Sequence, residues 1–559
     1  MISRLNIIII IFLAAFILLC FKLFFWQVIK GGSLASQAES QYQMGKVVTA
    51  PRGNIFSSDQ SLLAVRREAW LVSASVPALT ESTQAVAGKL APILDDDPQR
   101  IKTLLDKRGY SWIPIKHKVS TEVKNNILAL GIDGIEFEEE EDRDYPEASA
   151  AAHLLGFVGK NSEGDDTGYF GLEGYYNLTL SAKAGYESGE KDARGIPIAI
   201  GNYREISAIK GVDLETNIDK TIQLSIEKKL KEGIEKYGAK GGTVIVANPK
   251  TGAILAMSSY PSFDPKKYFD YGDAYFKNPA ISDSFEPGSI FKVIVMAAAL
   301  DSGAVTTETI CDICNGSFRV DKYTIETWDN KYHPDSAPID IIVHSDNVGM
   351  VFVGRKLGVD KMYDYLNMFG IGKETGIDLQ GEAAPTLRHK GMWNEVDLAT
   401  ASFGQGVAVT GIEMVRAVSA IANGGILPTP QVVSKLKGDG WEENLKPKGV
   451  SVISAQTAKE VTAMMVLAAK NGESKWTNTP GFSVAGKTGT AQIPIAGHYD
   501  PQSVIASFIG FSPAQEAKFI MLVTLKEPTS SRWASETAAP LWYAIAKDLF
   551  PYFGIQPEK

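Results

Sequence analysis

Residues 287–292 read Pro-Gly-Ser-Ile-Phe-Lys and open a mainly apolar run that continues to Leu300. The Pro-Gly pair before the run and Gly303 after it predict a buried helix with Ser289 at its N-terminus. Residues three positions apart lie on one face of a helix, so Ser289 and Lys292 can share a hydrogen bond. A serine hydroxyl becomes an effective nucleophile only when a base takes its proton, and Lys292 is the candidate base.

Two more motifs follow in order, Ser345-Asp346-Asn347 and Lys487-Thr488-Gly489. A short motif on its own carries a high risk of a false match, whereas three motifs in this order are specific. The trio resembles the signature of the penicillin-binding proteins and class A β-lactamases, which react through a serine acyl-enzyme. The resemblance implies a serine transpeptidase domain of the α+β class, in which helices flank an antiparallel sheet.

Lys292 can act as a base only in its neutral form. Burial in apolar surroundings and repulsion from a second cation, for which Lys487 is the candidate, would both lower its pKa. The resemblance implies that Ser345 relays protons between the two lysines and the leaving group, and that Asn347 hydrogen-bonds the substrate's peptide backbone. Asp346 alternates with its two neighbours along the chain, so we expect it to point away from the cleft and to have a structural role.

Residues 482–490, Phe-Ser-Val-Ala-Gly-Lys-Thr-Gly-Thr, predict an edge strand along which an extended peptide can lie. Gly489 permits close approach. Lys487 offers charge, and Thr488 and Thr490 offer hydroxyl groups, to a substrate's terminal carboxylate.

The same resemblance implies an oxyanion hole made by the backbone amides of Ser289 and Thr490. A helix N-terminus at Ser289 would favour the same developing negative charge. The plain structural alternatives are a helix cap at Ser289, a surface lysine at Lys292 and an ordinary turn at Lys487-Thr488-Gly489. The ordered trio favours catalysis over these alternatives.

The chain has 559 residues, of which 45% are hydrophobic, and this length exceeds what one hydrophobic core normally supports. We expect residues 1–30 to form a cytoplasmic tip and membrane anchor, 31–210 an elongated α+β pedestal without catalysis, and 211–559 the transpeptidase domain. The formal net charge of −9 argues against a nucleic-acid partner, which would need a basic surface.

Residues 5–29 are almost entirely apolar and lie between Arg4 and Lys30. About 20 apolar residues cross a bilayer, so this segment predicts a single transmembrane helix. A short, positively charged N-terminus stays in the cytoplasm, which would place the catalytic domain on the other side of the membrane. A cleaved signal peptide is the alternative, because Ser33-Leu34-Ala35 offers small residues at a plausible cleavage position.

Four segments of the pedestal resemble motifs of class B penicillin-binding proteins, namely Pro51-Arg52-Gly53-Asn54-Ile55, Arg143-Asp144-Tyr145-Pro146, Ala152-His153-Leu154-Leu155-Gly156 and Gly171-Leu172-Glu173-Gly174-Tyr175. Ser57-Ser58-Asp59-Gln60 stands where the family usually has an Asp-Arg-Asn-Gly turn. His153 lies in an apolar stretch without a partner motif, so we expect it to have a packing role.

The acidic run at residues 138–142 leads into a segment similar to the catalytic glutamate segment of the glycosyltransferases fused to class A penicillin-binding proteins. The other motifs of those glycosyltransferases are missing from the sequence. We interpret the run as a solvated strand or loop face and expect a monofunctional enzyme.

Phe285-Glu286-Pro287-Gly288 and Ser402-Phe403-Gly404-Gln405-Gly406 resemble division-type (septal) class B proteins more than elongation-type ones. Thr410-Gly411-Ile412-Glu413 departs from the Thr-Pro-x-Gln that often follows in the family.

Cys311-Asp312-Ile313-Cys314 forms a C-x-x-C segment. In an oxidising compartment we expect a disulfide or a plain structural pair. A zinc site is the alternative, for which His333 and His344 are the nearest further ligands. The proposed chemistry requires no cofactor and no metal.

Together with the apolar N-terminal segment, the resemblance implies a D,D-transpeptidase anchored in the bacterial cytoplasmic membrane, with peptidoglycan stem peptides as substrates and β-lactams as acylating inhibitors. The resemblance implies a membrane-embedded glycan polymerase of the SEDS type and other division proteins as partners. A β-lactamase or β-lactam sensor is one alternative, since residues 395–399 resemble the class A deacylation loop, with Ala399 in place of its asparagine. A division scaffold with little catalysis is another.

Overall fold

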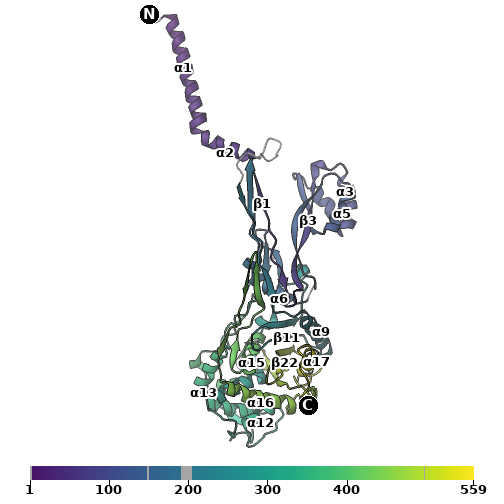
Figure 1. Ribbon diagram of the computed structural model, residues 1–559, viewed down its shortest axis with the longest axis vertical. Coiled ribbons are helices and arrows are strands. Elements are labelled where there is room, and N and C mark those ends of the chain that lie inside the picture. The colour runs from purple at the N-terminus through teal and green to yellow at the C-terminus, as the bar shows by residue number, and fades with distance from the viewer. Residues whose placement is uncertain (1–2, 148–149, 191–203, 496–497, 559) are drawn as a thin grey trace. The chain divides into compact units, whose positions relative to one another are not determined.

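The computed structural model describes residues 3–147, 150–190, 204–495 and 498–558 (Figure 1). The chain divides into two compact units. The first combines Met1–Arg52 with Ser181–Gly211, and the second combines Gly53–Leu180 with Val212–Lys559. Each unit is therefore built from two separated stretches of sequence.

The first unit contains the predicted N-terminal apolar helix. Helix α1 covers Arg4–Phe24 and continues as a π-helix over Phe25–Ile29. The most apolar 18-residue window of this 26-residue helix has a mean hydropathy of 3.1 and contains no buried residue, so the length and composition of the helix suffice to cross a membrane. The unit also contains α2 (Gly31–Tyr42) and an antiparallel sheet of β1 (Gln43–Val48), β8 (Gly185–Glu190) and β9 (Arg204–Ile206).

The second unit contains a seven-stranded sheet with the order β19-β18-β10-β2-β3-β4, in which β5 also pairs with β3. It joins strands from the N-terminal part of the unit to two strands that lie more than 200 residues further along the chain. The strands are β2 (Ile55–Phe56), β3 (Leu62–Ser75), β4 (Trp112–Val119), β5 (Ile135–Asp144), β10 (Asp213–Thr216), β18 (Val433–Gly438) and β19 (Trp441–Asn444).

Three short helices, α3 (Thr83–Leu94), α4 (Pro98–Leu105) and α5 (Thr121–Leu128), belong to the same part of the unit. Their apolar faces share a core with the strands, which includes Val72 and Leu90. The acidic run at residues 138–142 lies on β5 and forms ion pairs with basic side chains of the sheet, as expected for a solvated strand face.

Three of the four pedestal motifs meet around one buried ion pair. Arg143 Nε donates to Glu173 Oε1 at 2.6 Å, and Arg143 Nη1 donates to the Gly53 carbonyl at 2.8 Å. A Cβ atom at Gly53 would lie 2.0 Å from the Val212 carbonyl oxygen, so this position requires glycine. A buried charge is tolerated only when it is paired and hydrogen-bonded, which this arrangement provides.

The C-terminal part of the second unit is organised around a five-stranded antiparallel sheet with the order β12-β11-β23-β22-β21. It contains two hairpins, β11-β12 and β22-β23, and β21, which carries Lys487, is an edge strand as predicted. The strands are β11 (Gly241–Ala247), β12 (Ile254–Tyr260), β21 (Ala485–Ile495), β22 (His498–Ser512) and β23 (Phe519–Lys526).

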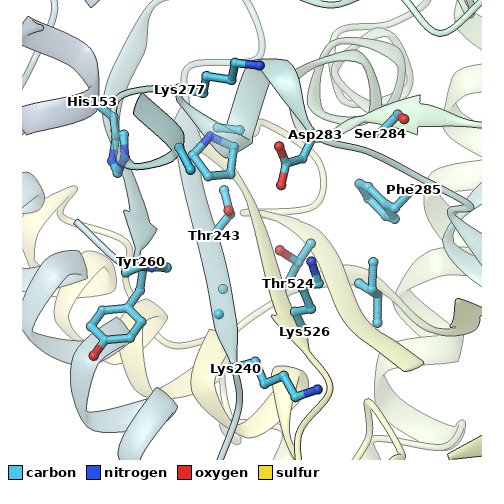
Figure 2. A pocket seen from close by; sticks show the side chains of 18 of the residues that line it. His153, Lys240, Thr243, Tyr260, Lys277, Asp283, Ser284, Phe285, Thr524 and Lys526 are labelled. Carbon is cyan, nitrogen blue, oxygen red and sulfur yellow. The ribbon is translucent and has the colours of Figure 1, made fainter. Parts of the chain in front are cut away.

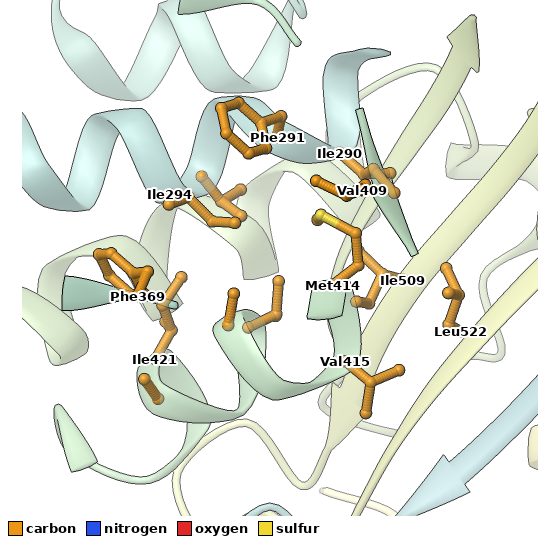
Figure 3. Close-up of a cluster of buried hydrophobic side chains, with 14 of the residues drawn as sticks. Ile290, Phe291, Ile294, Phe369, Val409, Met414, Val415, Ile421, Ile509 and Leu522 are labelled. Atoms are coloured by element: carbon orange, nitrogen blue, oxygen red, sulfur yellow. The ribbon is translucent and has the colours of Figure 1, made fainter. Parts of the chain in front are cut away.

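Helices cover both faces of this sheet, which confirms the predicted α+β class. On one face α9 (Lys220–Tyr237) and α17 (Ala538–Tyr552) pack against the strands and bury Trp542 completely. On the other face α11 (Lys292–Asp301), α15 (Gly411–Ala422) and α16 (Ala455–Asn471) build the larger core. Figure 3 shows part of that core, in which Ile290 and Phe291, the two residues after Ser289, pack among buried aliphatic side chains.

Candidate active site

Ser289 lies in a tight turn against the edge strand. The α-helix begins three residues later than predicted, because Gly288–Phe291 form a 3-10 turn and α11 starts at Lys292. Gly288 has a φ of +56°, a conformation that favours glycine, and its amide donates to the Gly404 carbonyl at 2.9 Å. The turn therefore holds Ser289 half-buried in a cleft of about 110 Å³, which is lined by Gly288, Ser289, Trp328, Asn347, Phe403, Gln405, Glu473, Thr490 and Trp533.

Lys292 is fully buried and is held by the Ser-Asp-Asn motif. Its Nζ donates to Asn347 Oδ1 at 2.8 Å, to the Ser345 carbonyl at 2.6 Å and, more weakly, to Ser345 Oγ at 3.4 Å. Among the hydrogen bonds of the described residues, the expected one between Lys292 and Ser289 Oγ is not formed. A buried ammonium group needs an acceptor for each of its three hydrogens, and the motif supplies three oxygen atoms.

The pKa of Lys292 is lowered from 10.5 to about 7. Burial is the larger cause, and repulsion by the Lys487 cation is the second. Both causes are those expected from the sequence. Glu473 and Asp346 act in the opposite direction. Near neutral pH, Lys292 is therefore neutral in a substantial fraction of the molecules, and in this form it can accept a proton.

Ser345 connects the two lysines. Lys487 Nζ donates to Ser345 Oγ at 2.9 Å, and Lys292 Nζ makes a longer contact of 3.4 Å to the same oxygen. Ser345 has a φ of +55°, which is uncommon for a residue with a side chain and is stabilised here by the surrounding structure. The strained position brings its hydroxyl between the two amino groups.

Asn347 and Asp346, the other two residues of the Ser-Asp-Asn motif, make different contacts. Asn347 Nδ2 donates to the Glu326 carbonyl at 3.0 Å, which orients its oxygen toward Lys292. Asp346 caps helix α13 (Asn347–Met368) by accepting from the Gly349 amide at 3.0 Å, so it has the expected structural role. Its carboxylate still contributes to the electrostatics of Lys292.

Strand β21 passes directly beside the turn that bears Ser289. A Cβ atom at Gly489 would lie 2.9 Å from Ile290 Cγ2 and 3.1 Å from Ile290 N, so glycine here allows the strand to approach the turn closely. Thr490 lines the cleft, and its Oγ1 accepts from the Ala534 amide at 3.1 Å. Thr488 Oγ1 donates to Glu473 Oε2 at 2.7 Å.

Sequence reasoning missed three residues that line the cleft, Glu473, Trp328 and Trp533. The two tryptophan rings meet edge to face with centroids 5.4 Å apart, and Trp328 Nε1 donates to the His344 carbonyl at 3.2 Å. Both tryptophans stand in polar segments between regular elements, which is a detectable signal for a functional aromatic residue. Glu473 is a glutamate near a helix end and offers no such signal.

Two residues singled out in the sequence, His153 and Glu395, make contacts that are typical of structural residues. His153 is buried, its Nε2 lies 3.0 Å from the Tyr275 carbonyl, and burial lowers its pKa to about 4, so it packs as a neutral side chain. Glu395 is exposed, pairs with Arg355 at 3.7 Å and is not part of the cleft lining. The resemblance of residues 395–399 to a deacylation loop is therefore not matched by their position.

Cys311 and Cys314 form a disulfide, so their sulfur atoms are not free to bind zinc. His333 and His344, the other residues of the zinc alternative, stack on each other with ring centroids 3.8 Å apart. Burial and repulsion between the two rings lower the pKa of His344.

A second, larger cavity of about 660 Å³ lies at one end of β11 and β23 (Figure 2). Lys277, Asp283 and Lys526 are among the side chains that surround it, and Lys240 on its rim pairs with Glu527 at 2.5 Å. None of the site residues predicted from the sequence lines this cavity. The lysines and carboxylates together give it no single sign of charge.

Comparisons with known proteins agree with this architecture. Residues 242–549 match the family model described as the penicillin binding protein transpeptidase domain, and residues 47–216 match the penicillin-binding protein dimerisation domain. Stage V sporulation protein D of Bacillus subtilis is 32% identical over 97% of this chain and 85% of its own. The probable peptidoglycan D,D-transpeptidase PenA of Neisseria gonorrhoeae is 29% identical over 94% of this chain and 88% of its own.

Solved structures show the same fold. Penicillin binding protein 2X of Streptococcus thermophilus superposes with a TM-score of 0.74 at 24% identity, over 92% of this chain and 83% of that one. A peptidoglycan synthetase of Bifidobacterium adolescentis superposes with a TM-score of 0.73 at 26% identity, over 92% of this chain and 98% of that one.

Proposed function

Since the chain belongs to the class B penicillin-binding proteins and is a peptidoglycan D,D-transpeptidase, we propose that Ser289 is its nucleophile and Lys292 the base that activates it. The observation that carries this assignment is that Lys292, which is buried three residues after the cleft residue Ser289 and contacts the cleft residue Asn347, has a pKa lowered to about 7. A lysine with an ordinary pKa would be protonated at neutral pH and could not accept the serine proton.

In the first step, Lys292 Nζ takes the hydroxyl proton while Ser289 Oγ bonds to the carbonyl carbon of the penultimate D-alanine. The backbone amides of Ser289 and Thr490 stabilise the negative charge that develops on the carbonyl oxygen. Asn347, which lines the cleft, holds the peptide backbone of the donor.

In the second step, the bond between the carbonyl carbon and the nitrogen of the terminal D-alanine breaks. The proton taken by Lys292 returns to that nitrogen through Ser345, whose Oγ is in contact with both lysines. Lys487 remains protonated and, with Thr488, Gly489 and Thr490, binds the donor's terminal group. The amine of a neighbouring stem peptide then attacks the acyl-enzyme and gives its proton to the same relay.

β-Lactams acylate Ser289 by the same attack. Because Glu395, the counterpart of a deacylating carboxylate, lies outside the cleft, the resulting adduct is long-lived and the β-lactamase alternative is not favoured.

We also propose the cellular arrangement. The N-terminal helix anchors the chain by a single pass in the bacterial cytoplasmic membrane, with residues 1–30 as anchor, 31–210 as pedestal and 211–559 as an extracytoplasmic transpeptidase domain. The length and hydropathy of the helix support this arrangement. A role in cell division with a SEDS-type polymerase and other division proteins is supported by the septal-type segments at residues 285–288 and 402–406.

The experiment is intact-protein mass spectrometry after exposure to benzylpenicillin. We expect one added adduct mass on the tryptic peptide that contains Ser289, and none on the Ser289→Ala variant, which keeps the fold because the side chain is only half-buried and makes no hydrogen bond among the described residues. An adduct elsewhere, or a rapid loss of the adduct by hydrolysis, would overturn the proposal.

A further inference from the structure

Glu473 places a carboxylate in the cleft, close to the charge that would bind the donor. It follows α16, is half-buried and lines the same cleft as Ser289 and Asn347. Its Oε2 accepts from Thr488 Oγ1 at 2.7 Å. The proposed acyl-transfer steps give it no role.

The hydrogen bond to Glu473 uses the only hydrogen that Thr488 can donate. The oxygen of the same hydroxyl accepts from Lys487 Nζ at 3.2 Å. Thr488 therefore cannot donate to an anionic substrate group while Glu473 accepts its hydrogen. Thr490 differs, because its Oγ1 accepts from the Ala534 amide and its hydrogen is donated to no acceptor among the described residues.

Glu473 also changes the electrostatic potential of the cleft. Its charge counters the effect of burial on the pKa values of both Lys487 and Lys292. A carboxylate that stabilises the Lys487 cation also reduces the attraction that this cation exerts on a second anion in the same cleft. The donor's terminal carboxylate would be that second anion.

We propose that Glu473 is a specificity-determining residue that weakens the preference of the cleft for donors with an anionic terminal group, relative to donors whose terminal group is neutral. Two effects act together: Glu473 competes for the Thr488 hydroxyl hydrogen, and it repels the incoming charge. The inference rests on the proposed function, because it takes Ser289 as the acylated residue and Lys487 as the residue that binds the terminal group.

The test compares two thioester donors with the same acyl group, one with a terminal carboxylate on its leaving group and the other with a carboxamide. The measured quantity is the ratio of their kcat/KM values. Any change in how well Lys292 activates Ser289 affects both donors alike and cancels in this ratio. A purely structural role of Glu473 would leave the ratio unchanged.

We expect Glu473→Gln to raise the ratio of carboxylate to carboxamide donor about five- to tenfold, since it keeps a hydrogen-bond acceptor but removes the charge. Glu473→Asp keeps the charge and should leave the ratio close to that of the unmodified protein. Glu395→Gln, a neutralised carboxylate on the surface outside the cleft, is the matched control and should not change it.

An unchanged or lowered ratio in Glu473→Gln, with Ser289 still acylated by both donors, would overturn this inference alone. If neither donor acylates Ser289 in the unmodified protein, the proposed function fails instead. Should Glu473→Gln be unstable, Glu473→Ala gives the second measurement. It removes both the charge and the acceptor of the Thr488 hydrogen, so it should also raise the ratio, and an unchanged or lowered ratio would contradict the proposal.

Discussion

Lys292 Nζ donates to Asn347 Oδ1 at 2.8 Å, so the middle motif of the trio holds the candidate base by its side chain. The Ser345 carbonyl accepts from the same Nζ at 2.6 Å. The amino group is thus held in place by contacts that do not involve Ser289. The position and the protonation of Lys292 therefore both depend on the Ser-Asp-Asn motif.

The rate of acylation should rise with pH through a midpoint near the Lys292 pKa, about 7, and reach a plateau above it. The sign follows from the role of the lysine, because only its neutral form accepts the serine proton and that form is populated as pH rises. The second-order rate constant for a fluorescent penicillin, measured between about pH 5.5 and 9, checks the prediction. A rate that is flat across this range would show that another group is the base.

Asn347→Asp should shift this profile to higher pH. The variant places a carboxylate where an amide oxygen now lies 2.8 Å from Lys292 Nζ, and an opposite charge at this distance raises a lysine pKa by about one to three units. The acylation rate at pH 7 should fall by at least about fivefold and recover partly at pH 9. Asn125→Asp, an exposed change on α5, is the control. An equal loss at every pH would point to substrate binding rather than to the base.

The pH dependence of stability should also report Lys292. Its pKa is about 7 in the folded protein against an ordinary value of 10.5, so between these values the unfolded chain binds more protons and unfolding becomes less favourable as pH rises. Compared with Lys292→Met, the free energy of unfolding of the unmodified protein should increase with pH, by up to about 1.4 kcal/mol per unit. Urea titrations of both proteins at pH 7 and 9 measure this difference, which stays constant if the lysine titrates normally.

Gly404→Ala should disturb the turn that carries Ser289. A Cβ atom there would lie 2.2 Å from the Gly288 carbonyl oxygen and 2.8 Å from Phe291 Cβ, and Gly404 has a φ of +80°. We expect destabilisation of about 1–3 kcal/mol together with slower acylation per folded molecule. Gly316→Ala has open space around the new methyl group and should have little effect on either quantity. Unchanged acylation in the Gly404 variant would mean that the turn adjusts without moving Ser289.

Arg143→Ala should destabilise the pedestal without changing the chemistry of the cleft. The Glu173 side chain has 0% exposure, so the variant leaves a buried carboxylate without its contact to Arg143. Removing one partner of a buried ion pair lowers the free energy of unfolding by about 3–5 kcal/mol. Thermal unfolding measures the loss, and acylation of the remaining folded protein by a fluorescent penicillin should be normal. Replacing both residues by apolar ones should cost less than Arg143→Ala alone.

Much of the fold could be predicted from local sequence patterns. The apolar N-terminal segment, the two hairpins of the catalytic sheet and the edge strand with Lys487 are determined by short-range hydropathy, β-branched residues and turn residues, which act between neighbours in the chain. The position of β18 and β19 in the same sheet as β2 and β3 has no such local signal. It depends on which strand edges remain available after the two parts of the unit come together.

The sequence by itself determined the three motifs, their order and the causes that lower the Lys292 pKa, because the chemistry of residue types and the spacing of a helix are local properties. Only the tertiary structure decided that Lys292 donates to Ser345 and Asn347 and not to Ser289, and that Trp328, Glu473 and Trp533 line the cleft. The physical reason is that a buried hydrogen bond forms with whichever acceptor the packed chain brings within about 3 Å. Ser345 follows Lys292 by 53 positions and Asn347 follows it by 55, so these contacts depend on packing that no local pattern encodes.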